Sequence, residues 1–574
     1  MEKIKYILLI IVFPMIMSCE KFLDRPPLDE VGIDNYWKTA TDLENYVVHF
    51  YPRFKGHSMV SDNNNRYYDE TASDNIIYTV PNNLLDGSTS PAPGRWISDW
   101  DDIRSVNIFL DNYTKCEDPF SSYQHFVGEA YFFKAWFYFN LVQQYGDVPW
   151  YTHALTPDDE AELLRPRDLR TLVVDSIVSQ LDKAIQFLDT RTKSENGNTR
   201  ITKEAALAFK TRVALYEGTW QKYHNGTPFG TPGANPQKYF QVCVNAAEEL
   251  MNGNYKVGIY NTGHPATDYH NLFNIGNMTP IDEVLLYRAY SIPEGITHEA
   301  NGYATLNPVG YGLTWGLVTS YLAVDGTPYD YKGLASTTKG NAFLTQIAND
   351  CDPRLRSTIW IPGELMFQSS GLVFDKPGLD KGISRLNTTG FQCRTFARSD
   401  IEVTGPVNDA GWIILRYAEV LLNYAEAKYE LDGTVATTQL NLLRARAGMP
   451  DFTVNPQSTD LNPVDYGYSI SDALYEIRRE RRIETAILNF RESDWKRWAA
   501  HSLFKGKRPK GYPFDATEFP GLSVSLDENG LIDPFKTDLP NGYEFRPGQD
   551  YLSSIPQTEL VLNPNLTQNP GWEN

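Results

Sequence analysis

The strongest helical pattern of the chain lies in residues 127–150 and just before them. Apolar side chains recur there at helical spacing, at Phe126, Ala130, Phe133, Phe137 and Leu141. Trp136, Tyr138 and Phe139 widen this stripe, so the helix is expected to be covered on more than one side. Gly146 and Pro149 are typical stop residues. The pattern predicts one long core helix that ends at Gly146.

Further helices are predicted on both sides of this one. A helix over 39–54 has Thr41 as a candidate N-cap. The remaining segments with helical periodicity are 103–110, 167–188, 202–223, 236–252, 412–431, 435–447, 470–487 and 492–504. Short turns join them in pairs, which resembles tetratricopeptide hairpins, but no fixed period of about 34 residues survives. The sequence predicts helical hairpins rather than a regular solenoid.

Between the helical parts, residues 258–411 are rich in Gly, Pro, Asn and aromatic residues. They predict loops and short strands with an occasional short helix such as 341–349. The fold class is therefore mainly α, with a large irregular, loop-rich region. We divide the chain into 19–257 (helical), 258–411 (irregular, contributing to a ligand site), 412–508 (helical again) and 509–574 (irregular, packed on the helices). The polar stretch 66–93 is long for a connection, which favours a functional loop.

The first 18 residues are typical of a removed signal peptide. Lys3 and Lys5 precede a short apolar run, which is too short for a comfortable membrane span. The run ends in Ile-Met-Ser-Cys, which predicts lipidation at Cys19 and anchoring by acyl chains.

The net charge of −20 argues against a nucleic-acid partner, because a polyanion would be repelled. The run Arg-Arg-Glu-Arg-Arg-Ile-Glu at 478–484 is basic but has Glu476, Glu480 and Glu484 at helical spacing. We interpret it as a set of ion pairs within and between helices.

Motifs of common enzymes are missing from the sequence. It contains no H-E-x-x-H, no G-x-S-x-G and no phosphate-binding loop. His264 and His270 lack an obvious third ligand, so structural or exposed histidines are favoured over a zinc site. Asp101-Asp102 and residues 158–160 are interpreted as a solvated helix face and a loop. We expect no cofactor and no metal. A glycosidase-type pair of carboxylates stays an alternative, because the sequence does not single out such a pair among its 72 acidic residues.

Four cysteines follow Cys19, at positions 116, 243, 351 and 393. An exported protein can form disulfides, but these cysteines are widely spaced in a large chain. We predict free and mostly buried thiols for Cys116, Cys243, Cys351 and Cys393, with one bridge left open.

Binding of a ligand with flat apolar faces and many hydroxyls is the chemistry that the aromatic residues support. Aromatic rings in polar loops can cover sugar faces while neighbouring polar groups bond the hydroxyls. The candidate residues are Trp96, Trp100, Asp99, Arg95, Tyr287, Tyr290, Tyr311 and Trp315. Trp96 and Trp315 are the preferred pair, although for each aromatic a role in the core or in anchoring a loop is equally compatible.

Four blocks of the chain resemble the SusD/RagB family of surface nutrient-binding lipoproteins. They are the lipidation start, the helix ending Gln-Gln-Tyr-Gly-Asp-Val-Pro, the segments 415–433 and 478–498, and the closing Ile-Pro-Gln-Thr-Glu-Leu…Asn-Pro-Gly-Trp572. The resemblance implies four tetratricopeptide-like helix pairs and attachment to the outside of a Bacteroidetes-type outer membrane. It also implies a partner, a TonB-dependent SusC-like transporter.

The expected function is therefore capture of an oligosaccharide at the cell surface and its delivery to that transporter, without catalysis. A surface-anchored glycoside hydrolase and a peptide-binding lipoprotein of the same architecture remain alternatives, because aromatic loops do not separate a glycan from a hydrophobic peptide.

Overall fold

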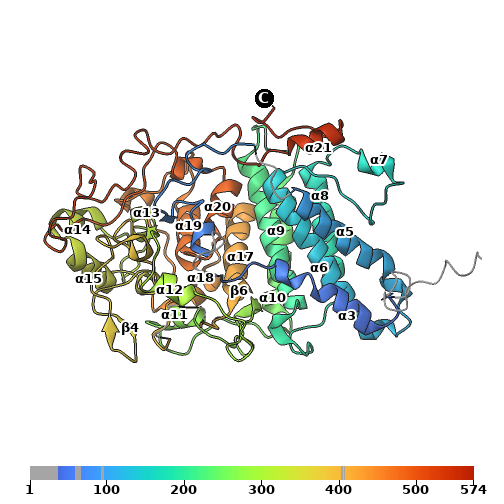
Figure 1. The fold of residues 1–574 in the computed structure, drawn as a ribbon, viewed down its shortest axis with the longest axis horizontal. Helices are drawn as coiled ribbons and strands as arrows, with labels where there is room; N and C mark the ends of the chain where they lie inside the picture. Colours follow the sequence, from blue (N-terminus) through green and yellow to red (C-terminus); the bar gives the residue numbers. More distant parts are fainter. Residues whose placement is uncertain (1–35, 59–65, 92–95, 402–404, 406, 574) are drawn as a thin grey trace, which may run out of the picture.

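The computed structural model describes residues 36–58, 66–91, 96–401, 405 and 407–573. Long helices form one side of the molecule, and short helices, loops and small strands form the other (Figure 1). The main helices are α3 (Ala40–Val48), α5 (Trp96–Asn112), α6 (Phe120–Tyr145), α8 (Arg170–Phe187), α9 (Lys203–Tyr223), α10 (Pro236–Asn252), α17 (Tyr417–Asp432), α18 (Thr437–Ala447) and α19 (Asp472–Glu484). The predicted mainly α fold with a loop-rich region is confirmed.

Shorter helices complete the described chain. They are α4 (Arg66–Glu70), α7 (Glu160–Leu163), α11 (Asp268–Leu272), α12 (Ala300–Ala304), α13 (Trp315–Val318), α14 (Tyr331–Thr337), α15 (Gly340–Asp350), α16 (Arg354–Thr358), α20 (Arg491–Arg497) and α21 (Gln557–Leu562). Single 3₁₀ turns lie at Tyr51–Arg53, Tyr113–Lys115, Gly197–Thr199, Ile383–Arg385, Gln457–Thr459 and His501–Leu503.

Helix α6 is the predicted central helix, and it begins seven residues earlier than the pattern indicated. Phe133, Phe137 and Leu141 are buried as expected. The helix ends at Gly146, whose φ of 74° suits glycine. A Cβ there would lie 2.8 Å from Leu552 Cδ1, so the C-terminal segment packs directly against the end of α6.

The helical hairpins pack through small residues. Helix α9 contacts α8, α10 and α17. At Gly218 of α9, an added Cβ would lie 2.7 Å from the ring of Phe240 in α10, so the two helices approach closely. Thr202 caps α9 as predicted, accepting a hydrogen bond from the backbone of Ala205. The predicted cap of α3 was wrong: Thr39, in a reciprocal pair with Asp42, caps this helix in place of Thr41.

Three two-stranded antiparallel pairs occur in the described part of the chain. They are β1 (Ile76–Ile77) with β3 (Gly312–Leu313), β2 (Val284–Arg288) with β6 (Trp412–Arg416), and β4 (Leu365–Phe367) with β5 (Leu372–Val373). Strand β6 corrects the prediction of a helix from residue 412. Tyr287 of β2 faces Ile413, and α17 starts only at Tyr417. A short apolar run such as Trp-Ile-Ile-Leu fits a strand or a helix, and pairing with β2 decides between them.

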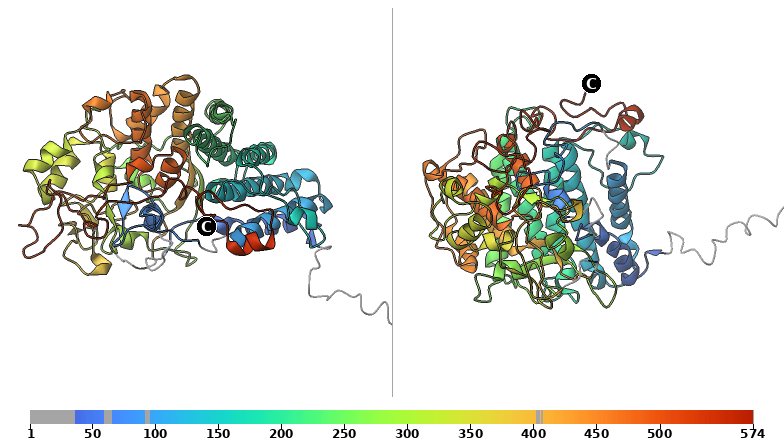
Figure 2. Two further views of the ribbon diagram at one scale, coloured as in Figure 1. Left: turned by 90° about the horizontal axis from the view of Figure 1, so that it is seen from above. Right: turned by 60° about the vertical axis from the view of Figure 1, so that its left-hand side comes forward.

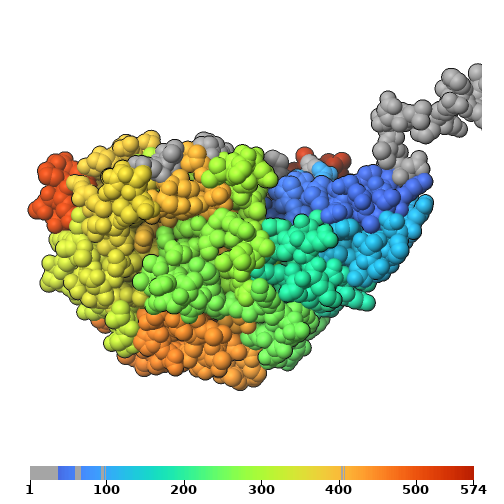
Figure 3. Space-filling view, turned by 90° about the horizontal axis from the view of Figure 1, so that it is seen from below, coloured from blue at the N-terminus to red at the C-terminus, as the bar shows by residue number. Residues whose placement is uncertain are grey.

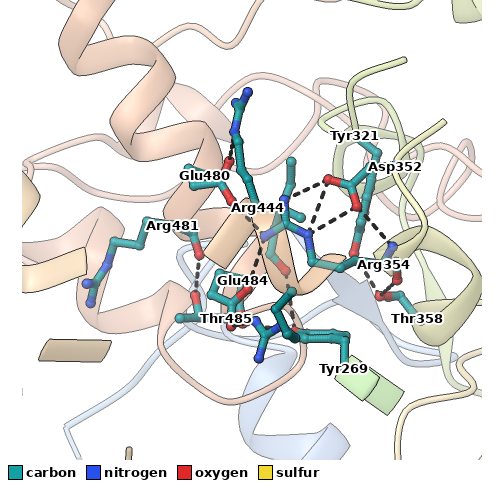
Figure 4. Close-up of polar contacts among 12 residues, drawn as sticks. Tyr269, Tyr321, Asp352, Arg354, Thr358, Arg444, Glu480, Arg481, Glu484 and Thr485 are labelled. Atoms are coloured by element: carbon teal, nitrogen blue, oxygen red, sulfur yellow. Dashed lines mark hydrogen bonds and ion pairs between the residues drawn. The ribbon is translucent and has the colours of Figure 1, made fainter. Parts of the chain in front are cut away.

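Helix α19 connects the two sides of the molecule through buried charges (Figure 4). Its arginines and glutamates from 478 to 484 are all buried. Glu484 accepts hydrogen bonds from Arg354, Arg416 and Arg446, which come from α16, β6 and α18. Burial raises the pKa of Glu484, but the three guanidinium groups outweigh it and lower that pKa to about 2. The predicted ion pairs are confirmed, and they lie inside the protein.

A second acidic group is also more buried than predicted. Asp102 was interpreted as part of a solvated face, but it is 8 % exposed and its carboxylate lies 2.8 Å from Arg53 Nε. The ion pair with Arg53 compensates for its loss of hydration.

All four predicted thiols are free. Cys243, Cys351 and Cys393 are buried, and Cys116 is half-buried. Burial raises the pKa of the Cys243 thiol, so this side chain acts as a small apolar residue.

The C-terminal segment returns over the helices and is fastened to α6. Asn569 Nδ2 donates to the carbonyls of Tyr145 and Ser553, and Trp572 Nε1 donates to that of Leu552. Figure 2 shows this end of the chain beside α21 and the N-terminal helices. On the opposite face, residues of the irregular region and of the N-terminal helices occupy separate halves of the surface (Figure 3). Among the described residues, no helix is long and apolar enough to cross a bilayer.

Candidate functional site

A surface pocket of about 440 Å³ lies where α5, the segment 149–155, α7 and α21 meet. Two of the predicted site residues, Trp96 and Trp100, line it. Asp101 and Arg104 of the same helix also line it. The rest of its wall comes from regions that are distant in the sequence, with Tyr151, His153, Leu163 and Leu562 among them. Figure 1 shows α7 and α21 as neighbours at the same edge of the molecule.

The two tryptophans have different roles in this pocket. Trp96 is 4 % exposed, and its ring packs edge-on against Tyr145 at 4.9 Å. Trp100, one turn further along α5, is half-buried and packs edge-on against Tyr151 at 5.4 Å. Trp96 therefore anchors α5 to the core, and Trp100 is the tryptophan with surface to offer to a ligand.

The segment that carries Tyr151 is held in place by α5 and α6. Asn107 Nδ2 donates to the carbonyl oxygen of His153 at 3.0 Å, and the backbone N–H of Tyr151 donates to the hydroxyl of Tyr138 at 2.7 Å. Burial raises the pKa of Tyr151 to about 12. Its phenol thus stays protonated at neutral pH and can both donate and accept a hydrogen bond.

Polar groups surround the aromatic rings. Asp101, Arg104 and His153 line the pocket and are exposed, and Glu559 of α21 is half-buried. Leu155, Leu164, Leu562 and Leu566 supply an apolar wall. Rings, apolar surface and a few polar groups in one concave site are the usual composition of a small-molecule site.

The predicted tyrosines lie elsewhere and are buried. Tyr290 is 9 % exposed and its hydroxyl donates to the carbonyl oxygen of His57 at 2.9 Å. Tyr287 lies in β2 with its hydroxyl 3.3 Å from that of Thr279. The Tyr311 ring lies 5.0 Å from that of Tyr78. These three side chains contribute to the core of the irregular region.

The structure also separates the preferred pair of tryptophans. Trp315 begins α13, is half-buried, and stacks on Phe343 with 5.8 Å between ring centroids. It packs against a different hydrophobic cluster from that of Trp96 and is absent from the wall of the pocket. Asp99 lies on α5 and is half-buried, outside the pocket wall, and Arg95 lies outside the described residues.

A second hollow, of about 450 Å³, lies on α8 and is less suited to stacking. Thr171, Asp175, Ser176 and Ser179 give it a polar wall. Its one aromatic residue, Trp150, is 9 % exposed, with Tyr138 at 4.1 Å and the Lys134 ammonium at 5.2 Å from the ring. Hydroxyls are available there, but no free ring face is.

Histidine ligation of a metal finds no support in the described part of the chain, where no group of three or more His, Cys, Asp or Glu is placed to hold an ion. His264 is exposed, and His270 Nε2 lies 3.0 Å from the carbonyl oxygen of Ala397.

Sequence reasoning missed Tyr151, His153, Arg104 and the contribution of α21 to the pocket. One signal was present: Pro149-Trp-Tyr directly follows the stop of α6, where a chain must turn across the neighbouring helix. Nothing local in the sequence indicates that α21 lies beside α7, since some 400 residues separate Leu562 from Leu163.

Fold and pocket together define a class: a helical-hairpin protein with an irregular half and an aromatic, partly polar surface pocket. Comparison with known families identifies the family within this class. The model of the SusD family matches residues 218–572, which is more than half of the chain, and a model described as starch-binding associating with outer membrane matches residues 21–215. The chain belongs to the SusD family.

Individual relatives agree with this assignment. SusD-like protein P2 of Formosa agariphila is 24 % identical over 82 % of this chain and 78 % of its own length. SusD-like protein P38 of the same organism is 26 % identical, but the match spans 38 % of this chain and only 43 % of that relative.

Solved structures show the same fold. A SusD-like protein of Bacteroides fragilis superposes with a TM-score of 0.72 at 23 % identity, covering 95 % of this chain and all of that one. A SusD-like carbohydrate-binding protein of the same organism also gives 0.72, at 22 % identity, covering 93 % of this chain and all of that one. A laminarin-binding SusD-like protein gives 0.56 at 18 % identity, with the same coverage of 93 % and 100 %.

Proposed function

We propose that this protein is a cell-surface lipoprotein that captures an oligosaccharide and delivers it to a SusC-like, TonB-dependent outer-membrane transporter without chemical change. Membership of the SusD family supports carbohydrate binding, because its relatives of known structure include carbohydrate-binding and laminarin-binding proteins. The matching model for association with the outer membrane supports the location. The predicted lipid anchor, Cys19, lies outside the described residues.

The observation that carries the proposal is the half-buried pair of Trp100 and Tyr151 in the 440 Å³ pocket. A pyranose ring presents C–H groups on its faces and hydroxyls around its edge. Trp100 can cover such a face, while Asp101 and Arg104 lie beside it on α5 to accept from and donate to the hydroxyls. The pocket has room for a few sugar units.

The test is calorimetry of the soluble protein, starting after Cys19, against a panel of plant, host and fungal polysaccharides, with peptides as controls. Saturable heat with one glycan class, and no product after long incubation, is the expected result. Saturable heat with peptides alone would show that the ligand is a peptide and not a glycan. The apolar wall of Leu155, Leu164 and Leu562 would favour such a ligand.

Hydrolysis is the second candidate function, because the carboxyl groups of Asp101 and Glu559 line the same pocket. Glycosidases use two carboxyl groups on opposite sides of the bond that they cleave. Release of reducing ends by the purified protein, abolished in Asp101→Asn and in Glu559→Gln, would establish this activity. Unchanged polysaccharide in the same assay would exclude it for the glycans tested.

A further inference from the structure

A small cavity of about 10 Å³ lies behind α19, away from the aromatic pocket. Four arginines line it, Arg478, Arg479, Arg482 and Arg491, together with residues 460–466 and the end of α13. No residue lines both this cavity and the aromatic pocket. This volume is close to the minimum that holds one water-sized species. The cavity therefore accepts a single small species, and sugars are excluded by size.

Three of these arginines have close carboxylate partners. Arg479 Nη2 lies 2.6 Å from Asp460 Oδ2, and its Nε lies 3.2 Å from Glu476 Oε1. Arg482 and Arg491 share a single carboxylate, that of Asp74, at 2.9 and 2.6 Å. Burial lowers the pKa of Arg482 to about 10; Asp74 opposes this, and the charge of Arg491 adds to it. The four arginines of the wall thus have three carboxylates at contact distance, those of Asp74, Asp460 and Glu476.

Arg478 has no carboxylate within ordinary hydrogen-bond distance. The nearest oxygens, from Glu426 and Glu430, are 3.7 and 3.9 Å away. Glu426 is already engaged by Arg497 and by the indole N–H of Trp498, both at 2.6 Å. Arg478 is 1 % exposed, and its Nε and Nη2 have no hydrogen-bond partner among the described residues. Its charge is instead covered by the rings of Tyr223, Tyr466 and Trp498, at 4.3 to 4.9 Å.

Two further donors at the cavity wall are also without a partner in the described structure. Arg491 is 3 % exposed and its Nη1 makes no hydrogen bond, and neither polar atom of the Asn462 amide makes one. Buried polar groups without a partner are rare, and those carrying charge are the costliest. Such atoms also occur elsewhere in the described structure, but three residues that carry them line this one cavity, and two of the three are cationic.

We propose that this cavity is a binding site for a monatomic anion of halide size, with chloride as the physiological candidate. An anion accepts from several N–H donors at once and offsets the excess positive charge. A water molecule must also donate two hydrogen bonds. The Oδ1 of Asn462 has no partner in the described part of the chain and can take one of them, whereas Asp460, the acidic residue in the wall, already accepts from Arg479, Tyr475 and the backbone of Asn462. Bound there, the anion links the 460–466 segment to α19 and α20.

The direct test uses crystals of the soluble protein grown with sodium bromide in place of chloride. We expect an anomalous bromine peak in the cavity, within hydrogen-bond distance of Arg478 and Arg491. A cavity that holds ordinary water density without an anomalous signal, in a crystal that shows bromide elsewhere on its surface, would overturn the proposal.

A solution test separates the site from general effects of salt. The Tm of the wild-type protein should rise with chloride, relative to gluconate at equal ionic strength, and the rise should follow the linkage relation for a single site. Asn462→Asp places a carboxylate at the cavity and should remove this dependence, because it supplies the negative charge and repels the anion. The matched control, Asn254→Asp on an exposed turn, should keep it. Equal Tm values in chloride and gluconate, or a chloride dependence retained in Asn462→Asp, would contradict the proposal.

Discussion

The helical half and the irregular half of this protein satisfy their backbone polar groups and hold their elements together in different ways. In the helical half, backbone polar groups are satisfied within helices, and apolar stripes such as that of α6 supply the contacts between elements. In the irregular half, residues 258–411 have little regular structure. Side chains satisfy part of the backbone there: the side-chain amides of Asn387 and Asn301 donate hydrogen bonds to loop carbonyls.

The difference explains why α19 is so highly charged and yet buried. In addition to apolar contacts, guanidinium and carboxylate groups connect the loops to the helices. Glu484 lies 3.0 Å from Arg354 of the irregular half (Figure 4) and also pairs with Arg446 of α18. Such pairs are directional, and removing one partner leaves the other charge buried without compensation. The contacts around α19 should therefore depend strongly on charge, and those around α6 on the volume of its apolar side chains.

Replacing Glu484 by Gln is expected to have the largest effect. The change keeps the shape but leaves Arg354, Arg416 and Arg446 without their shared charge, which should lower the free energy of unfolding by about 3 to 5 kcal/mol. Equilibrium unfolding in urea measures it. The control, Glu492→Gln, removes a half-exposed pair with Lys496 and should cost below about 1 kcal/mol. Equal losses in the two variants would refute the dependence on buried charge.

Leu141→Ala tests the helical half. Leu141 is fully buried in α6, so its truncation leaves a cavity and should cost about 2 to 5 kcal/mol in the same urea experiment. Leu442→Ala in α18, where the side chain is 45 % exposed, is the matched control and should change stability by less than about 0.5 kcal/mol. A small effect at Leu141 would mean that volume does not hold the helices together.

Acid should destabilise the packing around His298. Burial lowers the pKa of His298 to about 4, below the ordinary 6.5, so the folded ring stays neutral while the unfolded one takes up a proton. The stabilisation is complete above pH 6.5 and falls as the pH drops towards 4, by about 2 kcal/mol between pH 6.5 and 5. Hydrogen exchange, corrected for its intrinsic rate, should show faster opening around His298 at pH 5, with little change in α8. Equal change in both regions would contradict this.

Sequence patterns predicted the helical half well because its elements are local. The ends of α9 and α10 follow from Thr202, Pro236 and Gly253, which act within one turn. Strand β6 was missed because its partner β2 is about 130 residues away. The burial of α19 was missed for the same reason, since its partners come from α16, β6 and α18.

The candidate site was predicted only in part. Trp100 was identified as an aromatic residue in a polar context, and the structure places it at a pocket. The preference for Trp96 and Trp315 as a pair stays a prediction, and their packing against separate hydrophobic clusters favours treating them apart. Tyr151 and α21 join the pocket only through tertiary packing, which no local pattern reports.

The most direct test of the account compares glycan binding by two single variants. Calorimetry with the glycan found in the panel should show at least a tenfold weaker affinity for Trp100→Ala, because the ring in the pocket is lost, with the fold intact by circular dichroism. Trp315→Ala, in the irregular half, should bind as the wild type does. Full affinity in Trp100→Ala, or loss of binding in Trp315→Ala alone, would contradict the assignment of the glycan to this pocket.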